Sequence, residues 1–293
     1  MKVNWGKVGG GVSVALAYVS FSIGIYFFIV RLGFRWAMSN YWVAFPVVDL
    51  TARTVMAIWS HLVCLFSDPF VPISVRAAGD GAAGASDCKK CFAVKTARTH
   101  HCSTCNRCVE RMDHHCPWIN KCVGLKNQKA FLLFLAYSCS AAVECLILVV
   151  VRLATCPNVA NAVVLFGLRF VLGEDKVDEL LAKAGPDSEF ATTEPTCQLT
   201  VEYTIAGVVA TVLMFFFVVF MTFISSDQIF AIVNNQTHVE VLKHEHGPKR
   251  SLRDAMIETF GMEPSMWWLV PIDWRFVGPL QQTSPQAVHL KAQ

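Results

Sequence analysis

Charged residues are scarce in this chain. Asp, Glu, Lys and Arg make up 16% of the 293 residues, whereas apolar residues make up 54%, and the mean hydropathy is +0.44. A chain with so little charge is too apolar for an ordinary soluble domain, so the composition predicts several membrane-spanning segments. The chain also lacks a long basic run and its net charge is only +3, so nucleic-acid binding is not expected.

The cysteines are not spread along the chain as a disulfide framework would require. Seven of the 12 lie between residues 88 and 122, and four of the nine histidines lie there too. Clustered cysteine and histidine are typical of metal binding in a reducing compartment. Outside this segment, Cys156 and Cys197 can form a disulfide or remain unpaired, and the sequence favours neither.

Four stretches are long and apolar enough to cross a membrane. They lie near residues 10–30, 43–66, 130–151 and 203–224. The second is the weakest, because three residues interrupt it: Pro46, Asp49 and Arg53. The apolar run of the first is longer than a signal-peptide core and no A-x-A site follows, so we expect it to remain as a span.

The distribution of basic residues predicts the orientation. The loop 67–129 holds ten Lys and Arg, whereas the loop 152–202 holds four, against eight acidic residues. By the positive-inside rule, the first loop is cytosolic and the second is luminal. With four spans, both termini are then cytosolic. The luminal loop has an apolar stretch at 159–172, which can lie on the membrane surface or form a small hairpin.

The sequence after the fourth span predicts one helix. Ser251 and Asp254 resemble a capping box, and Gly261 is the predicted stop. Farther on, Trp267 and Trp268 suit a membrane interface, or equally the core of a small cytosolic subdomain.

One metal-ligand pattern occurs twice between residues 88 and 122, with an offset of 14 residues. The first copy comprises Cys88, Cys91, His101 and Cys108. The second copy comprises Cys102, Cys105, His115 and Cys122. Each copy supplies three thiolates and one imidazole, a ligand set of closed tetrahedral zinc sites. The sequence therefore predicts two zinc ions held by interleaved segments.

Eleven Cys and His donors lie in this segment, and two four-coordinate sites use eight of them. The three that remain are His100, His114 and Cys116. The offset assigns His101 and His115 only relative to each other, because His100 and His114 preserve the same repeat. The spacing alone leaves the choice of histidine ligands open.

Cys116 is the candidate nucleophile. It has no partner in a C-x2-C pair, because Ile119 stands where the second cysteine would be. His114 is the candidate base, and Asp113 can orient its imidazole and stabilise the imidazolium. A Cys–His pair forms a thiolate readily, which suits thioester chemistry. A Cys3His zinc site is net negative, so we expect the zinc ions to stabilise the module rather than to activate Cys116.

The predicted position of Cys116 indicates the class of substrate. It lies shortly before the third span, so it is expected at the cytosolic membrane face, where a fatty acyl tail can lie between helices. Lys95 and Arg98 can meet the phosphates of a soluble acyl carrier such as coenzyme A, or they are ordinary positive-inside charge. Phe131 and Phe134 can line the site of the tail, or pack in the core.

The segment from Cys88 to Phe131 resembles the cysteine-rich domain of the DHHC-type protein S-acyltransferases, also called palmitoyltransferases. The residues that carry the resemblance are His100-His101-Cys102, Met112-Asp113-His114-His115-Cys116-Pro117-Trp118 and Asn120-x-Cys122-Val123-Gly124-x2-Asn127. The four-span layout and Asp68-Pro69 after the second span fit as well.

The resemblance implies an α-helical integral membrane protein with four transmembrane helices and a cytosolic two-zinc cysteine-rich domain between helices 2 and 3. The implied regions are 1–66 with helices 1 and 2, 67–129 with the linker and zinc domain, 130–224 with helices 3 and 4, and 225–293 as the cytosolic tail. It also implies the ligand choice. One zinc ion is held by Cys88, Cys91, His101 and Cys108, and the other by Cys102, Cys105, His115 and Cys122.

The activity that the resemblance implies has two steps. Palmitoyl-CoA acylates Cys116, with His114 as the base and Asp113 orienting His114. The acyl group then passes to a cysteine of another protein. We therefore expect a protein-cysteine S-palmitoyltransferase with two structural Zn²⁺ ions. The candidate acyl-CoA contacts are Lys95, Arg98, His100, Trp118, Phe131 and Phe134.

The expected partners are acyl-CoA, the lipid bilayer, and membrane-associated substrate proteins bearing cytosolic cysteines. An accessory subunit is a further candidate, and nucleic acid is not expected. We expect an endomembrane location, Golgi or ER before plasma membrane, with the active site in the cytosol.

Three positions depart from the family pattern. Thr96 follows Lys95 where the family has proline, His238 replaces the second threonine of Thr-Thr-x-Glu, and Ala255 stands where an asparagine is common. If these groups brace the active site, activity is low or depends on a partner. The main alternative function is a catalytically silent, zinc-stabilised membrane adaptor. A thiol redox protein is a weaker alternative, because zinc claims every C-x2-C pair.

Overall fold

A computed structural model describes residues 10–12, 14, 41–72, 86–95, 98–155, 164, 167–184 and 201–272. The chain divides into two compact units, and the division crosses each of the long helices. One unit contains residues 55–138 and 223–293, and the other contains residues 22–54 and 139–222. The expected first span near residues 10–30, and Cys156 and Cys197, lie almost entirely outside the described residues.

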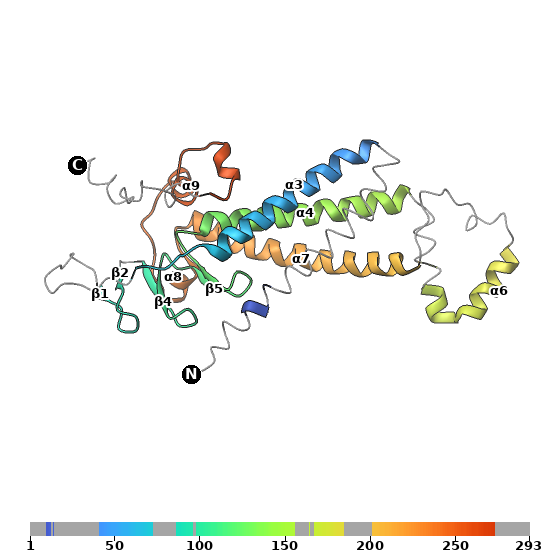
Figure 1. The fold of residues 1–293 in the computed structure, drawn as a ribbon, viewed down its shortest axis with the longest axis horizontal. Coiled ribbons are helices and arrows are strands. Elements are labelled where there is room, and N and C mark those ends of the chain that lie inside the picture. Colours follow the sequence, from blue (N-terminus) through green and yellow to red (C-terminus); the bar gives the residue numbers. More distant parts are fainter. Residues whose placement is uncertain are drawn as a thin grey trace. The chain divides into compact units, whose positions relative to one another are not determined.

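Helices make up most of the described chain, and short hairpins make up the zinc segment (Figure 1). The helices are α3 (Tyr41–Phe66), α4 (Gln128–Thr155), α6 (Glu174–Ala184), α7 (Val201–Val233), α8 (His238–Leu242), α9 (Leu252–Phe260) and the 3-10 turn η3 (Met266–Leu269). The strands are β1 (Ser86–Asp87), β2 (Val94–Lys95), β3 (Thr99–Cys102), β4 (Arg107–Glu110), β5 (His114–Cys116) and β6 (Lys121–Val123).

Three of the described helices are long and apolar enough to span a membrane. Their spanning parts are Ala44–Phe66 of α3, Gln128–Val151 of α4 and Thr211–Val233 of α7. The second and third predicted spans thus coincide with α3 and α4. The fourth predicted span lies within α7, and this helix continues beyond residue 224 to Val233.

The helix α3 continues through the residues that weakened its prediction. Arg53 pairs with Asp49 one turn away at 2.7 Å, and its Nε also lies 3.4 Å from Glu144 of α4. Opposite charges at i and i+4 on one helix face stabilise the helix and reduce the cost of charge inside an apolar segment. Around them, Leu50 and Cys145 pack with neighbouring apolar side chains of α4 and α7.

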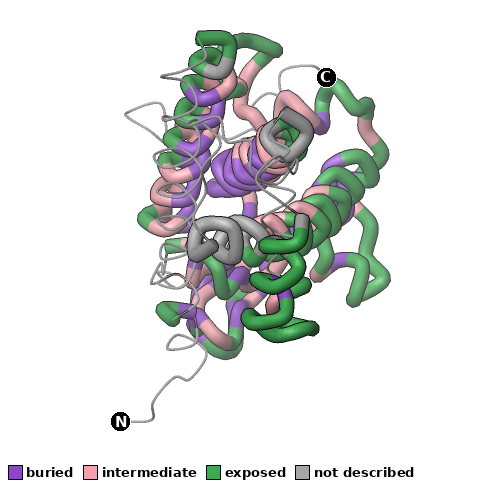
Figure 2. The backbone as a smooth tube through the Cα atoms, turned by 90° about the vertical axis from the view of Figure 1, so that its right-hand side faces the viewer, coloured by how far each residue is buried: buried purple, intermediate pink, exposed green. Residues whose placement is uncertain are grey.

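The zinc segment consists of three antiparallel hairpins, β1–β2, β3–β4 and β5–β6. Each is too small to hold a hydrophobic core, and the buried residues within them are mostly cysteines. Such a module needs metal to be stable, because so few apolar residues cannot offset the conformational entropy lost on folding. Along the tube of Figure 2, buried stretches alternate with exposed ones.

The predicted tail helix is confirmed as α9. Ser251 caps its N-terminus and accepts a hydrogen bond from the backbone N–H of Asp254. Gly261 ends it in the left-handed conformation, with φ of 85°. Preceding it, Thr237 and Glu240 form a full capping box at the start of α8. Of the apolar stretch 159–172, the described residues 167–172 are helical, with Phe170 and Val171 exposed.

Candidate functional site

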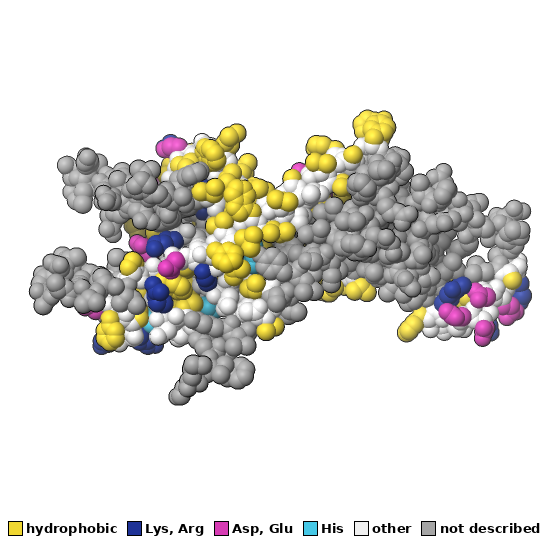
Figure 3. Space-filling model, viewed as in Figure 1, with side chains coloured by type: hydrophobic (Ala, Val, Ile, Leu, Met, Phe, Trp, Pro, Cys, Tyr) yellow, Lys and Arg dark blue, Asp and Glu magenta, His cyan; other side chains and the backbone are white. Residues whose placement is uncertain are grey.

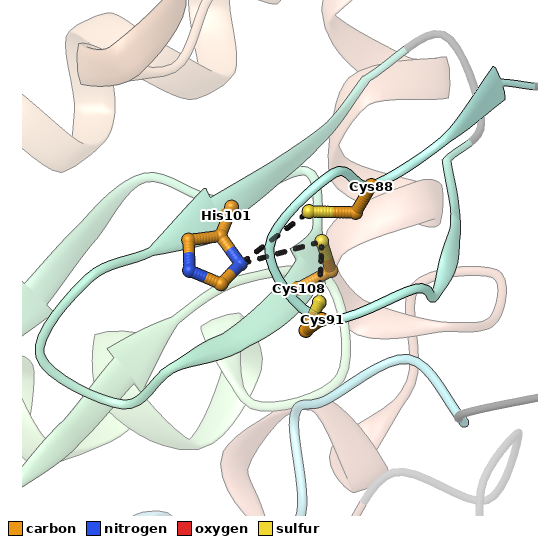
Figure 4. A group of neighbouring side chains, drawn as sticks. All are labelled: Cys88, Cys91, His101 and Cys108. Carbon is orange, nitrogen blue, oxygen red and sulfur yellow. Dashed lines mark hydrogen bonds between the residues drawn. The ribbon is translucent and has the colours of Figure 1, made fainter.

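Four side chains of the first pattern converge in one cluster (Figure 4). We call Cys88, Cys91, His101 and Cys108 the first cluster. His101 Nδ1 lies 3.6 Å from Cys88 Sγ and 3.9 Å from Cys108 Sγ, and the sulfurs of Cys91 and Cys108 are 3.5 Å apart. All four ligand atoms lie within 4.8 Å of one another.

The second pattern converges in the same way. We call Cys102, Cys105, His115 and Cys122 the second cluster. His115 Nδ1 lies 3.7 Å from Cys102 Sγ, 3.3 Å from Cys105 Sγ and 3.7 Å from Cys122 Sγ. In a tetrahedral site with Zn–S bonds of about 2.3 Å and a Zn–N bond of about 2.0 Å, neighbouring ligand atoms are about 3.5–3.8 Å apart. Both clusters therefore fit zinc.

Strand pairing explains the repeated spacing. His101 is the direct cross-strand partner of Cys108 in β3–β4, and His115 is the partner of Cys122 in β5–β6. In each cluster, a histidine and a cysteine that are separated by six residues in the sequence are thus direct neighbours across one hairpin. The choice that spacing left open is resolved geometrically, since His101 and His115 join the clusters. His100 instead lies 2.9 Å from Lys243 Nζ.

Asp113, His114 and Cys116 lie together beside the second cluster. His114 Nδ1 is 2.8 Å from Asp113 Oδ2, and the side chain of His114 also hydrogen-bonds that of Cys116. Burial lowers the pKa of His114, but its hydrogen bonds to Asp113 and Cys116 and the nearby negative charge raise it to about 9. Cys116 itself is 3% exposed. A base held between a carboxylate and a thiol has the arrangement required for nucleophilic catalysis.

Two further groups hold Asp113, and sequence reasoning missed one of them. Gln228 Nε2 of α7 donates to Asp113 Oδ2 at 2.6 Å, and the backbone N–H of His238 donates to Asp113 Oδ1 at 2.8 Å. Burial raises the pKa of Asp113, but His114, the His238 N–H and Gln228 together lower it below its usual value. No sequence signal marks Gln228, because it lies 115 residues beyond Asp113 in an apolar helix.

The structure shows which contact the departure at His238 leaves unchanged. The contact with Asp113 comes from the backbone of His238, so replacing a threonine side chain there leaves this hydrogen bond in place. Ala255 is completely buried in α9, where its carbonyl accepts from Thr259 Oγ1. Thr96 lies outside the described residues.

The polar candidates for acyl-CoA contact lie in different surroundings. Arg98 pairs with Glu240 at 2.5 Å and donates to the side chain and carbonyl of Asn235. His100 is buried against Lys243. Lys95 of β2 is half-buried. Arg98 is thus occupied in linking the zinc segment to α8.

Two of the aromatic candidates form a row of rings that starts at His114. The ring of Phe131 meets that of His114 edge-on at 5.6 Å, and Phe134 lies 6.5 Å from Phe131. Phe134 also packs on His61 of α3, whose Nε2 lies 2.9 Å from the Trp118 carbonyl. Phe131 and Phe134 are buried, whereas Trp118 is partly exposed. The structure therefore places the ring of Phe131 against His114 with Phe134 beside it, and it connects the Trp118 backbone to α3.

These features define an integral membrane protein with two zinc-type clusters and a Cys–His–Asp site beside them. The family model of the DHHC palmitoyltransferases matches residues 83–245, more than half of the chain, and the chain belongs to this family. The chain is 31% identical to palmitoyltransferase ZDHHC7 of Mus musculus over 195 residues, which are 65% of this chain and 51% of that protein.

Two fungal relatives match shorter parts. Palmitoyltransferase pfa3 of Emericella nidulans is 40% identical over 121 residues, 34% of this chain and 24% of that protein. Palmitoyltransferase pfa3 of Neurospora crassa is 71% identical over 51 residues, 17% of this chain and 8% of that protein. The chain thus spans between 8% and 51% of the length of these three relatives.

Proposed function

We propose that this protein is a protein S-acyltransferase that moves a palmitoyl group from palmitoyl-CoA to cysteine thiols of membrane-associated proteins. The observation that carries the proposal is the chain of contacts from Asp113 through His114 to Cys116. A metal-stabilised module has no need of these three groups once eight other side chains fill two zinc sites. Palmitoyltransferase is also the printed name of the three relatives described above.

The first step forms an acyl-enzyme. His114 takes the proton of the Cys116 thiol, and Asp113 stabilises the imidazolium that results. The thiolate attacks the carbonyl carbon of the palmitoyl thioester, so a new C–S bond forms and the bond to the coenzyme A sulfur breaks. The imidazolium returns its proton to the departing thiolate. Gln228 and the His238 N–H keep Asp113 aligned through this cycle.

The second step transfers the acyl group. A cysteine thiol of the substrate protein gives its proton to His114 and attacks the acyl-Cys116 thioester. The substrate gains an S-acyl chain, and the proton on His114 returns to the Cys116 sulfur. The acyl chain adds about 0.8 kcal/mol of membrane affinity per buried CH₂, which strengthens membrane association when a second signal is present.

The zinc ions are the structural part of the proposal. Cys88, Cys91, His101 and Cys108 would hold one ion and the second cluster would hold the other, each ion supplying folding free energy. We also propose four spans, with regions 1–66, 67–129, 130–224 and 225–293, the zinc module in the cytosol of an endomembrane, and an acyl tail beside Phe131 and Phe134. An accessory subunit remains part of this proposal.

Brief exposure of the purified protein to palmitoyl-CoA, followed by intact-mass spectrometry, tests the proposal. We expect a hydroxylamine-labile gain of one palmitoyl group in the wild type and no gain in Cys116→Ala. The matched control is Cys139→Ala, which removes a cysteine of α4 outside both clusters and should be acylated normally. Each variant is first shown to retain two zinc ions.

The outcomes separate the two candidate functions. Acylation that persists in Cys116→Ala would contradict the assigned nucleophile. Absence of acylation in wild-type protein that carries both zinc ions would favour the zinc-stabilised adaptor. Loss of zinc from Cys116→Ala would instead make Cys116 a metal ligand.

A further inference from the structure

The helix α3 carries a buried imidazole near the end that precedes the zinc segment. His61 lies within the spanning part Ala44–Phe66 and is 3% exposed. Most exposed side chains of this helix are apolar, and Figure 3 shows hydrophobic side chains gathered along it. An ionisable side chain inside a spanning helix is costly unless polar groups meet it, and it commonly marks a functional site. The contacts of His61 therefore indicate its role.

His61 reaches the loop that follows Cys116. Its Nε2 lies 2.9 Å from the carbonyl oxygen of Trp118. Because a carbonyl can only accept, Nε2 carries a proton and donates it to this hydrogen bond. Cys116 ends β5 and pairs with Lys121 at the start of β6, so residues 117–120 form the loop of this hairpin. The imidazole is thus bonded to the loop just beyond the proposed nucleophile.

The same loop has one internal hydrogen bond and a second connection to the end of α3. The Asn120 N–H donates to the Pro117 carbonyl at 3.2 Å, and Asn120 adopts the left-handed conformation with φ of 49°. Lys121 Nζ donates to the carbonyl of Ser67, the residue that follows α3, at 2.5 Å. The position of Cys116 at the base of this loop therefore depends on how α3 holds the hairpin.

The ring of His61 also ends the row of rings that starts at His114. It lies 5.0 Å from the ring of Phe134. Phe134 lies 6.5 Å from Phe131, which meets His114 edge-on at 5.6 Å. His61 is therefore connected to the nucleophile through its N–H and to the base through its ring. The N–H connection is the more direct, because two other rings stand between His61 and His114.

We propose that His61 is a positioning residue for acyl transfer, whose Nε2–H holds the Trp118 carbonyl and so keeps the Cys116 thiol in reach of His114. The inference rests on the proposed function, because it concerns the same nucleophile. His61 acts through the loop and not on the acyl group itself. The hydrogen bond carries this role, and the ring contact with Phe134 does not.

Three substitutions of His61 separate the donor from the ring. His61→Gln keeps an N–H donor without the ring, His61→Phe keeps a ring without the donor, and His61→Leu removes both. Each full-length variant is first shown to retain two zinc ions. Its single-turnover acylation by palmitoyl-CoA is then followed by intact mass over a range of palmitoyl-CoA concentrations.

We expect the rate at saturating palmitoyl-CoA to fall about 10-fold in His61→Phe and His61→Leu, and to stay within about threefold of wild type in His61→Gln. The concentration at half-saturation should change less than the rate, because the donor holds the nucleophile and not the acyl-CoA. The matched control is Ser60→Ala. Ser60 is the buried neighbour of His61, and its hydroxyl donates to the Met56 carbonyl within α3. This variant should react at the wild-type rate.

Hydrogen exchange of the loop amides gives a second readout that needs no acyl transfer. We expect faster exchange at residues 118–121 in His61→Phe and His61→Leu than in wild type and His61→Gln. Wild-type protein that is not acylated would contradict the proposed function. The exchange rates would still report whether His61 holds the loop.

Two results would overturn the inference. If His61→Phe kept the wild-type rate while His61→Gln was slow, the ring contact and not the donor would be responsible. Loop exchange that is equal in His61→Phe and wild type would show that the Trp118 carbonyl does not depend on His61, whether or not the protein is acylated. If His61→Leu failed to retain zinc, the comparison of His61→Gln with His61→Phe would still decide between donor and ring.

Discussion

The two zinc clusters have one ligand pattern but different surroundings. Among the described residues, the first cluster packs with Ala93 and Val71. The second cluster packs with Val109, Met112, Phe70 of the segment after α3 and Val239 of α8. Its ligand His115 also stands between His114 and Cys116. The same ligand pattern therefore occurs in two settings. Only the second cluster has a ligand within the segment that carries Asp113, His114 and Cys116.

The largest expected effect comes from removing one ligand from each cluster. Cys102→Ser breaks the second cluster, so we expect loss of its zinc and of all acylation of Cys116. Cys88→Ser breaks the first cluster, and we expect one zinc ion and measurable acylation to remain. Zinc analysis together with palmitoyl-CoA labelling of both variants checks this difference.

This pair of variants also shows whether the clusters are independent. The β3–β4 hairpin supplies ligands to both, His101 and Cys108 to the first and Cys102 and Cys105 to the second. Loss of both zinc ions in Cys88→Ser would mean that the hairpin couples the clusters and that the difference in their surroundings has no functional consequence.

The next effect concerns the connection of the zinc module to α8. Arg98→Ala leaves Glu240 buried without its cation, and breaking a buried ion pair in this way costs about 3–5 kcal/mol. We expect a large drop in thermal stability of the detergent-solubilised protein. Arg253→Ala, which breaks an exposed pair with Glu263, is the control and should change stability by less than about 1 kcal/mol.

The same experiment separates two roles for Arg98. If Arg98 instead bound the phosphates of coenzyme A, Arg98→Ala would raise the palmitoyl-CoA concentration needed for half-maximal labelling while stability stayed unchanged. The buried pair with Glu240 predicts the opposite pattern.

Much of the fold and site followed from local sequence. Apolar length predicted α3 and α4, the Ser251 and Gly261 signals predicted α9, and ligand repetition predicted both clusters. What could not be predicted depends on long-range contacts. Spacing could not choose between His100 and His101, because the choice is made by strand pairing. Gln228 was missed because its role depends on how α7 meets Asp113.

The third effect tests the support of Asp113 on the side of the second cluster. Gln228→Leu removes a hydrogen bond to a buried carboxylate, a contribution of about 1.5–3 kcal/mol. We expect the rate of Cys116 acylation to fall about 10–100-fold if most of this contribution acts in the transition state. Asp227→Asn, on the exposed side of the same turn, is the control.

In this prediction Gln228 positions Asp113 for catalysis. A purely structural role of Gln228 predicts a different result. Gln228→Leu should retain both zinc ions and lose no more than about 1.5–3 kcal/mol of stability relative to Asp227→Asn, while the labelling rate falls. Equal losses of rate and of zinc would show that Gln228 only supports the fold.

The smallest effect distinguishes the turns that follow the two C-x2-C pairs. Phe92 follows Cys91 with φ of 57°, and Asn106 follows Cys105 with φ of 52°. Asparagine adopts this left-handed conformation readily, whereas most other L-residues incur about 1–2 kcal/mol. Phe92 is also 71% exposed, so its ring adds little burial. The first cluster therefore carries backbone strain that the second avoids.

Exchanging the two residue types measures this strain. We expect Phe92→Asn to stabilise the protein by about 1 kcal/mol and Asn106→Phe to destabilise it by a similar amount, because the conformational cost moves from one turn to the other. The rate of zinc release to a chelator reports the change at each cluster, and thermal unfolding reports the sum. If Phe92→Asn gave no stabilisation, a contact of the exposed Phe92 ring would have to offset the backbone strain. The turn of the first cluster would then be a binding surface.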